Sequence, residues 1–254
     1  MPRYALETKT TKPLTRPSKL SRHGVVRVIS KLGAGSRTQA AQWVREGRVR
    51  VNGHVVRDSE LPVWQGQDRI ELDGQTLEPA ERHVVMLNKP RGLVATTKDE
   101  HGRDTVYRCF ARAALPWLAP VGRLDKASEG LLLFSNDPTW AARVTDPTSG
   151  PDKTYHVQID RLPAASLVAN LERGVVLGGE RLAAKSARCL RTGRTNAWLE
   201  IVLDEGRNRQ IRRLLSHFDV AVLRLVRVAV GPLWLGELPQ GQWRLLTKQE
   251  IDLW

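Results

Sequence analysis

The residues of this chain best suited to chemistry lie in the run Gly122-Arg123-Leu124-Asp125, which stands just ahead of an apolar segment ending at Phe134. Arg123 and Lys126 flank the single carboxylate, and a nearby cation favours the charged form of such a group, so we expect Asp125 to remain ionised. An ionised aspartate serves as a base, a nucleophile or a metal ligand. Little else near Asp125 in the sequence looks like a second metal ligand. An aspartate ahead of a strand is also a common turn former, so its function depends on the rest of the chain.

A second candidate segment runs from Asp204 to Leu215 and contains the sequence Gly-Arg-Asn-Arg-Gln-Ile-Arg-Arg. Its apolar residues fall at helical spacing, which predicts a helix with one buried face and with Arg209, Arg212 and Arg213 directed elsewhere. Residues 205–227 hold six arginines and no lysine. Arginine suits bidentate recognition of phosphate or carboxylate. The simpler alternative is a solvated charged face.

The elements that must position these residues are mostly strands. Alternation from Thr154 to Asp160 predicts a half-buried strand that carries Tyr155, either as a core residue or as an aromatic face. Further strands are predicted at residues 84–87, 198–203 and 221–230, and a capping box at Thr247 opens a short final helix. Long strands with few helices predict an α+β domain whose sheet is mixed and mostly antiparallel.

The N-terminal part has a different pattern. Apolar residues at helical spacing predict a helix from Val25 to Leu32, and Ser36 with Gln39 has the spacing of a capping box that starts a second helix. Alternating residues around Asn52-Gly53 then predict a β-hairpin. Residues 1–21 are polar, basic and proline-containing, and we expect them to be a disordered tail.

Charge is distributed unevenly over the 254 residues, whose formal net charge is +13. Residues 1–57 hold thirteen Lys and Arg against only Glu7 and Glu46. This excess continues beyond the tail into a foldable segment, which indicates a protein that binds a polyanion, most simply nucleic acid.

Several spaced motifs together carry a family resemblance. The segment Gly35-Ser36-Arg37, followed by residues 46–53, resembles the RNA-binding domain named after ribosomal protein S4. The Asp125 run, Lys153-Thr154-Tyr155, residues 205–213 and the turn Lys89-Pro90-Arg91-Gly92 resemble the bacterial ribosomal-RNA pseudouridine synthases of the RsuA family in order and spacing. The implied domains are an S4-type domain at residues 22–81 and a catalytic domain at residues 82–254.

The resemblance implies that uridine is isomerised to pseudouridine within ribosomal RNA. Asp125 matches the essential aspartate of the family, Tyr155 the tyrosine that stacks on the target base, and Arg212 the basic residue that pairs with the aspartate. Whether Asp125 attacks covalently or removes a sugar proton stays open. No cofactor or metal is expected, because nothing is oxidised and no group leaves the substrate. The expected RNA-binding residues are Arg27, Lys31, Arg37, Arg45, Arg48, Arg50, Arg123 and Arg209.

Two other functions fit parts of the sequence. A non-catalytic RNA-binding protein of ribosome assembly accounts for the charge, but gives no reason for the three catalytic positions to occur together. An enzyme acting on a small phosphorylated substrate is disfavoured by the lack of a glycine-rich phosphate loop.

Composition and hydropathy complete the expectations. No apolar stretch reaches the ~20 residues needed to span a bilayer, and Cys109 and Cys189 are too few for a disulfide framework. We expect a cytoplasmic monomer that acts on ribosomal RNA or a pre-ribosomal particle, with large-subunit RNA preferred.

Overall fold

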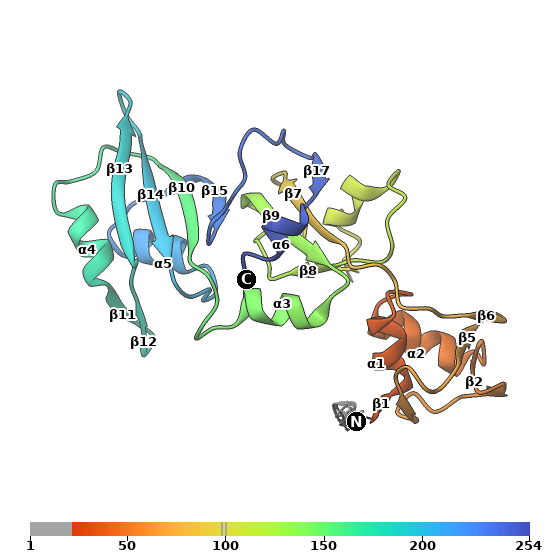
Figure 1. Cartoon of the computed structure of the whole chain (residues 1–254). Coiled ribbons are helices and arrows are strands. Elements are labelled where there is room, and N and C mark those ends of the chain that lie inside the picture. The colour runs from red at the N-terminus through yellow and green to blue at the C-terminus, as the bar shows by residue number, and fades with distance from the viewer. Residues whose placement is uncertain (1–21, 98, 100) are drawn as a thin grey trace, which may run out of the picture.

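The computed structural model describes residues 22–97, 99 and 101–254, and the tail expected at residues 1–21 lies outside the described residues. The described chain forms a small N-terminal part and a larger one, which lie side by side (Figure 1). Each part has apolar core residues of its own.

The small part consists of two helices packed beside short strands. The helices are α1 (Val25–Lys31) and α2 (Arg37–Arg45). A four-stranded antiparallel sheet has the order β3-β2-β5-β6, from β2 (Val49–Val51), β3 (His54–Val55), β5 (Ile70–Leu72) and β6 (Gln75–Thr76), while β1 (Arg22–Gly24) pairs with β4 (Pro62–Trp64).

The local signals predicted for this part are present. The Ser36 side chain accepts from the Gln39 amide at 3.1 Å and the Gln39 side chain accepts from the Ser36 amide at 2.9 Å, which completes the capping box. Asn52 and Gly53 both have positive φ, at 51° and 83°, as the turn between β2 and β3 requires. The two helices and the hairpin are therefore confirmed.

The larger part is built on one nine-stranded sheet, whose main path has the order β13-β14-β10-β15-β9-β7-β17. All of its strand pairs are antiparallel except β15 with β9. The strands are β7 (Val84–Lys89), β8 (Ala119–Val121), β9 (Glu129–Ser135), β10 (Lys153–Ile159), β13 (Ser186–Thr192), β14 (Ala197–Leu203), β15 (Val222–Val230), β16 (Leu233–Trp234) and β17 (Trp243–Leu245). The mixed, mostly antiparallel α+β fold predicted from the sequence is confirmed.

Helices cover both faces of this sheet. The buried side chains of α4 (Leu167–Arg173) and α5 (Gln210–His217) join the core that contains Tyr155, Val157 and Ile159. On the other face of the sheet, Trp140 of α3 (Pro138–Thr145) packs with Val84 and Met86, and residues of α6 (Lys248–Ile251) border that cluster. A 3₁₀ helix η1 (Val106–Phe110) and a small hairpin, β11 (Val175–Leu177) with β12 (Glu180–Leu182), complete the fold.

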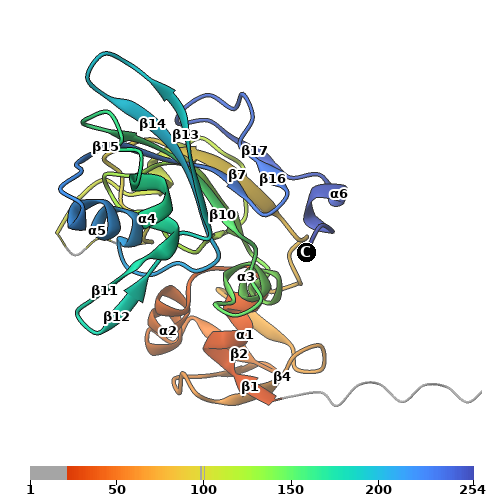
Figure 2. The same cartoon turned by 90° about the vertical axis from the view of Figure 1, so that its left-hand side faces the viewer.

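The parallel pair of β15 with β9 is the seam at which two antiparallel halves of the sheet meet (Figures 1 and 2). Only a glycine fits at one point of the seam. Gly130 has a φ of +99°, and a Cβ placed on it would overlap the carbonyl oxygen of Arg227. Glycine thus supplies both the conformation and the close approach of the two backbones.

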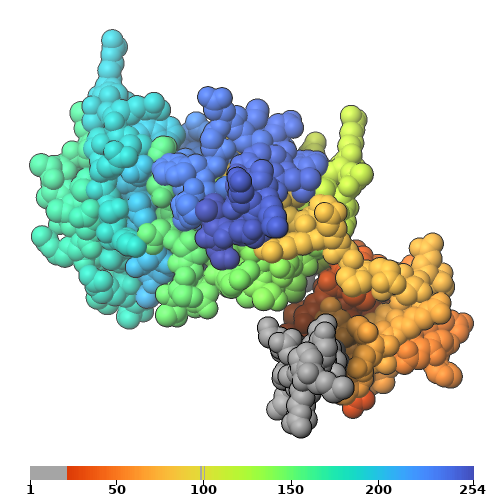
Figure 3. Space-filling model, in the orientation of Figure 1, coloured from red at the N-terminus to blue at the C-terminus, as the bar shows by residue number. Residues whose placement is uncertain are grey.

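The segment between the two parts is fixed by side chains of the larger one. Asn136 donates to the Glu81 carbonyl at 2.8 Å and accepts from the His83 amide at 2.8 Å. The Ala80 amide donates to the carbonyl of Leu32, at the end of α1, at 3.2 Å. These bonds tie the connecting segment to both parts, and Figure 3 shows the small part below and to the right of the larger one.

Candidate active site

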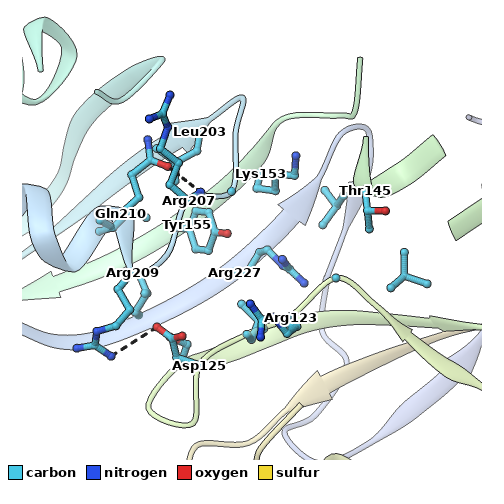
Figure 4. Close-up of a pocket in the computed structure, with 18 of the residues that line it drawn as sticks. Arg123, Asp125, Thr145, Lys153, Tyr155, Leu203, Arg207, Arg209, Gln210 and Arg227 are labelled. Carbon is cyan, nitrogen blue, oxygen red and sulfur yellow. Dashed lines mark hydrogen bonds and ion pairs between the residues drawn. The ribbon is translucent and has the colours of Figure 1, made fainter. Parts of the chain in front are cut away.

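A cleft opens at the seam of the sheet. It encloses about 280 Å³ and is lined from one side by residues 121–125 and Leu133, and from the other by β10, β15 and the start of α5. Asp125, Tyr155 and Arg212, the three catalytic residues predicted from the sequence, all line this cleft, as do Arg123 and Arg209 (Figure 4). They come from segments far apart in the chain and are brought together by the pairing of β15 with β9.

The loop that carries Asp125 is held from outside by three donors. The carbonyls of Lys126, Ala127 and Ser128 accept hydrogen bonds from the Gly92 amide at 2.8 Å, the Arg212 Nη2 at 3.2 Å and the Lys89 Nζ at 2.8 Å. The loop also closes on itself, since the Ser128 amide donates to the Asp125 carbonyl at 2.9 Å. The backbone beneath the carboxylate is therefore fixed before any substrate arrives.

The Asp125 carboxylate itself is 38% exposed and faces the cleft. Its ion pair in the described structure is with Arg209, whose Nη1 lies 3.6 Å from Asp125 Oδ2 (Figure 4). Arg209 has a left-handed backbone, with φ 49° and ψ 34°, and immediately precedes α5. Non-glycine residues rarely adopt this conformation, and where they do it often marks a functional site.

The pairing of Arg212 with Asp125 that the resemblance implies stays a prediction, because the hydrogen bonds of Arg212 in this structure are with backbone carbonyls. Arg212 lies within the first turn of α5, and its terminal nitrogens donate to the carbonyls of Val222 at 3.3 Å and Ala127 at 3.2 Å. It therefore supports the loop backbone, while Arg209 meets the carboxylate. Burial, together with the positive charge of Arg209, lowers the pKa of Arg212, and the nearby Asp125 opposes that shift.

Tyr155 forms part of the cleft wall opposite the Asp125 loop (Figure 4). It lies on β10 between Ile201 of β14 and Arg227 of β15 and is 9% exposed. The strand thus buries the body of the ring in the core and leaves it in contact with the cleft. Such a surface can accept a stacked base.

Three further cations, Lys153, Arg207 and Arg227, line the cleft and were not predicted as site residues. Arg227 is 7% exposed, and its Nε donates across the seam to the Leu131 carbonyl at 2.8 Å. Lys153 is half-buried, and burial followed by the charge of Arg227 lowers its pKa, although Asp152 and Asp204 act in the opposite direction. A signal for Arg227 was present in the sequence, because it interrupts the inward-facing apolar series of β15 between Leu225 and Ala229.

Lys89 lies behind the loop rather than in the cleft. It is fully buried, and its Nζ donates to the carbonyls of Pro90 at 3.1 Å and Ser128 at 2.8 Å. Burial lowers its pKa to about 8, against the opposing influence of Glu129 and Asp125.

The basic residues predicted to bind RNA in the small part differ in their surroundings. Arg27, Arg37, Arg45, Arg48 and Arg50 are exposed, and Lys31 is half-buried. Arg48 is already engaged, because it makes two hydrogen bonds to Asp73, at 2.9 and 2.6 Å, and a third to Glu46 at 3.3 Å. Arg50 donates to the Gly53 carbonyl at 2.9 Å. These contacts reduce the charge that Arg48 can offer to a ligand.

No cluster of three or more His, Cys, Asp or Glu side chains arranged to hold a metal ion is found within the described residues. None of the helices in the described part of the chain combines the length and the apolar character that crossing a bilayer requires.

Comparison with known proteins adds to this geometry. Residues 83–217 match the family model described as RNA pseudouridylate synthase, and residues 24–77 match the S4 domain. The chain is 34% identical to the ribosomal large subunit pseudouridine synthase B of Bacillus subtilis, over 89% of this chain and 92% of that protein. It is 35% identical to the ribosomal small subunit pseudouridine synthase A of Pseudomonas aeruginosa, over 89% of this chain and 97% of that protein.

A solved structure shows the same likeness. A crystal structure of a pseudouridylate synthase matches with a TM-score of 0.62 and 30% identity, over 91% of this chain and 99% of that one. The order of the two matched domains, the sequence identities and the structural match agree. The chain belongs to the RNA pseudouridine synthases of the RsuA family, with an S4 domain at its N-terminal side.

Proposed function

We propose that this protein isomerises a specific uridine of ribosomal RNA to pseudouridine, with Asp125 as the catalytic carboxylate, Tyr155 as the stacking residue and Arg212 as the support of the catalytic loop. The observation that carries the proposal is the single cleft lined by all three residues. The proposed domains are residues 22–81 for RNA binding and residues 82–254 for catalysis.

The reaction requires the target nucleotide to leave its stack, since its C1′ and C5 atoms are not accessible within a helix. A base flipped into the cleft can stack on Tyr155, an interaction worth about 1–3 kcal/mol for an aromatic side chain. The bond between N1 and C1′ then breaks, the uracil turns, and a bond forms between C5 and C1′. The C5 proton is lost and N1 gains a proton, so the substrate and product are isomers.

Asp125 provides the charged oxygen for this step, by covalent attack or by proton abstraction. Its fixed loop fits either mechanism, because a carboxylate that is already oriented requires little rearrangement as the reaction proceeds. Arg209 stands against the carboxylate, and Arg123 extends from the same loop. We propose that both contact the RNA near the flipped nucleotide, together with Arg27, Lys31, Arg37, Arg45, Arg48 and Arg50 of the S4 domain.

We infer that the target lies in large-subunit RNA, either free or in a pre-ribosomal particle, and that the protein acts as a cytoplasmic monomer. The relative in B. subtilis, similar over nearly all of this chain, is named for the large subunit. The relative named for the small subunit has a similar identity, so the target must be mapped directly.

The decisive experiment is a pseudouridine map of total ribosomal RNA from a deletion strain, complemented with wild-type protein, Asp125→Asn or Asp252→Asn. Asp252 lies exposed after α6, far along the chain from the cleft residues, and provides the matched control. We expect one site to be lost on deletion and restored by wild type and Asp252→Asn, but not by Asp125→Asn. Identical maps from all strains would instead favour a non-catalytic RNA-binding protein or a substrate outside the ribosome.

A further inference from the structure

Arg227 and Lys153 form a pair of cations on the inner wall of the cleft, beside Tyr155. Arg227 is the register partner of Tyr155 across β10 and β15, and Lys153 lies two residues before Tyr155 on β10. Figure 4 shows Arg227 between Tyr155 and Arg123, and Lys153 above Arg227 with its amine directed away from it.

Arg227 is buried and Lys153 is half-buried, and neither has an acidic partner among the described residues. Among the described residues, no carboxylate lies within ion-pair distance of either side chain, and the nearest acidic neighbour in sequence, Asp152, pairs instead with Lys185 at 2.8 Å. The Nε of Arg227 bonds to Leu131, and no bond from its terminal nitrogens to another described residue is found. Buried charged groups are usually paired, because removing a charge from water is costly.

The two charges also repel each other, as the effect of Arg227 on the Lys153 pKa shows. A ligand that brings negative charge to this wall would offset the desolvation of Lys153 and the repulsion between the two cations. Arginine and lysine donate hydrogen bonds only, so the ligand atoms that fit here are acceptor oxygens. Arginine additionally offers a planar pair of donors that suits two oxygens at once.

We propose that Arg227 and Lys153 bind an anionic oxygen of the flipped nucleotide, an inference that rests on the proposed function. Two groups of the nucleotide supply such an oxygen. One is the phosphodiester that joins it to the RNA chain. The other is a uracil carbonyl, which gains negative charge when the bond between N1 and C1′ breaks. Arg227 and Lys153 thus become substrate-binding residues beyond the Asp125, Tyr155 and Arg212 positions.

The test uses the full-length protein and an RNA fragment that contains the mapped uridine. We expect Arg227→Gln to reduce single-turnover formation of pseudouridine by about 10- to 100-fold, the range for loss of a hydrogen bond to a charged group. Arg227→Lys should recover part of the rate, and Lys153→Met should lower it. Arg191→Gln and Lys248→Met, both exposed and outside the cleft, are the matched controls and should stay within twofold of wild type.

Modified RNA distinguishes the two sources of the oxygen. A neutral methylphosphonate beside the target uridine removes the phosphate charge, while 2-thio- or 4-thiouridine replaces a carbonyl oxygen by a weaker acceptor. The modification that removes the partner of Arg227 should slow the wild type and abolish the further effect of Arg227→Gln. If each modified RNA instead slowed the wild type and Arg227→Gln by the same factor, the effects of the RNA change and of the substitution would be independent. That result would overturn the proposal, because it would mean that Arg227 does not touch the nucleotide.

A binding measurement separates this inference from the proposed function. NMR titration with uridine 5′-monophosphate requires no turnover, and we expect Arg227→Gln to weaken binding at least tenfold, with thermal unfolding as the check on folding. Binding that depends on Arg227 in a protein without synthase activity would refute the proposed function and retain the anion site. If the wild type is active and the rates and affinities of Arg227→Gln and Lys153→Met are unchanged, the anion site alone is refuted. Wild type that neither binds nor reacts would refute both.

Discussion

At the scale of single residues, the buried lysine behind the catalytic loop connects stability with pH. Lys89 loses its proton more easily in the folded protein than in the unfolded chain, because burial lowers its pKa from 10.5 to about 8. Below pH 8 it is charged in both states, and folding carries the full cost of burying that charge. Between about pH 8 and 10.5 the unfolded chain still binds the proton while the folded protein releases it, so the free energy of unfolding rises with pH.

This sign gives a measurable prediction. Urea unfolding of wild type and Lys89→Met should be compared from pH 7 to pH 10, and the free energy of unfolding of wild type should rise relative to the variant across that interval. Lys248→Met, which removes an exposed lysine of α6, controls for the loss of one positive charge. A constant difference between wild type and Lys89→Met would show that the burial of Lys89 does not alter its protonation.

The residue scale also shows where prediction from the sequence stops. Asp125, Tyr155 and Arg212 were found as members of motifs, and all three line one cleft. The ion pair of Asp125 with Arg209 was not predicted. It depends on the left-handed backbone of Arg209, a conformation that the presence of an arginine does not indicate. The placement of Arg227 opposite Tyr155 depends on strand register, which an alternating pattern does not reveal.

At the scale of elements, the predictions succeeded where a local signal was strong. The capping boxes at Ser36 and Thr247, the Asn52-Gly53 turn and the apolar series in α5 each specify structure within a few neighbouring residues. The edge strand β13 was not predicted, because it is mostly exposed and its residues alternate weakly. The order of strands in the sheet could not be predicted from the sequence either, because long-range packing joins segments about one hundred residues apart.

The seam gives a prediction at the same scale. Gly130→Ala should lower the free energy of unfolding by at least about 3 kcal/mol, because it combines left-handed strain with overlap between backbones. The control is Gly236→Ala, which has a φ of +60° but nothing within 4 Å of the new Cβ, and which should cost only about 1–2 kcal/mol. Equal losses in thermal or urea unfolding would mean that β15 and β9 can separate to accommodate a methyl group.

At the scale of the whole molecule, the uneven charge determines how RNA is held. The S4 domain carries exposed arginines beside the catalytic domain and is fixed there by the bonds of Asn136 and Ala80. We therefore expect an RNA that enters the cleft to be held at two places, by the cleft and by the S4 domain. Arg48 is already paired with Asp73, so we expect most of the affinity of the domain to come from its unpaired basic residues.

A charge-neutralising variant of the full chain tests whether the unpaired basic residues of the S4 domain supply most of its affinity for RNA. Gln in place of Arg27, Lys31, Arg37 and Arg45 should weaken RNA binding and reduce the slope of log affinity against log salt by about 3, from four lost phosphate contacts. A second variant, with Gln at Arg161, Arg188, Arg191 and Arg194, changes the net charge equally and should leave the slope almost unchanged. The same slope in both variants would indicate that net charge alone attracts the RNA.

The parallel pair at the seam also governs when the enzyme becomes active during its own synthesis. Asp125 precedes β9, which begins at Glu129, whereas the partner strand of β9, β15, begins only at Val222. Contacts between residues so distant in sequence form slowly, because closing a long loop costs entropy before any packing is gained. A growing chain therefore contains the whole S4 domain and Asp125 well before it can form the cleft, and we expect its RNA-binding part to be complete before its catalytic part.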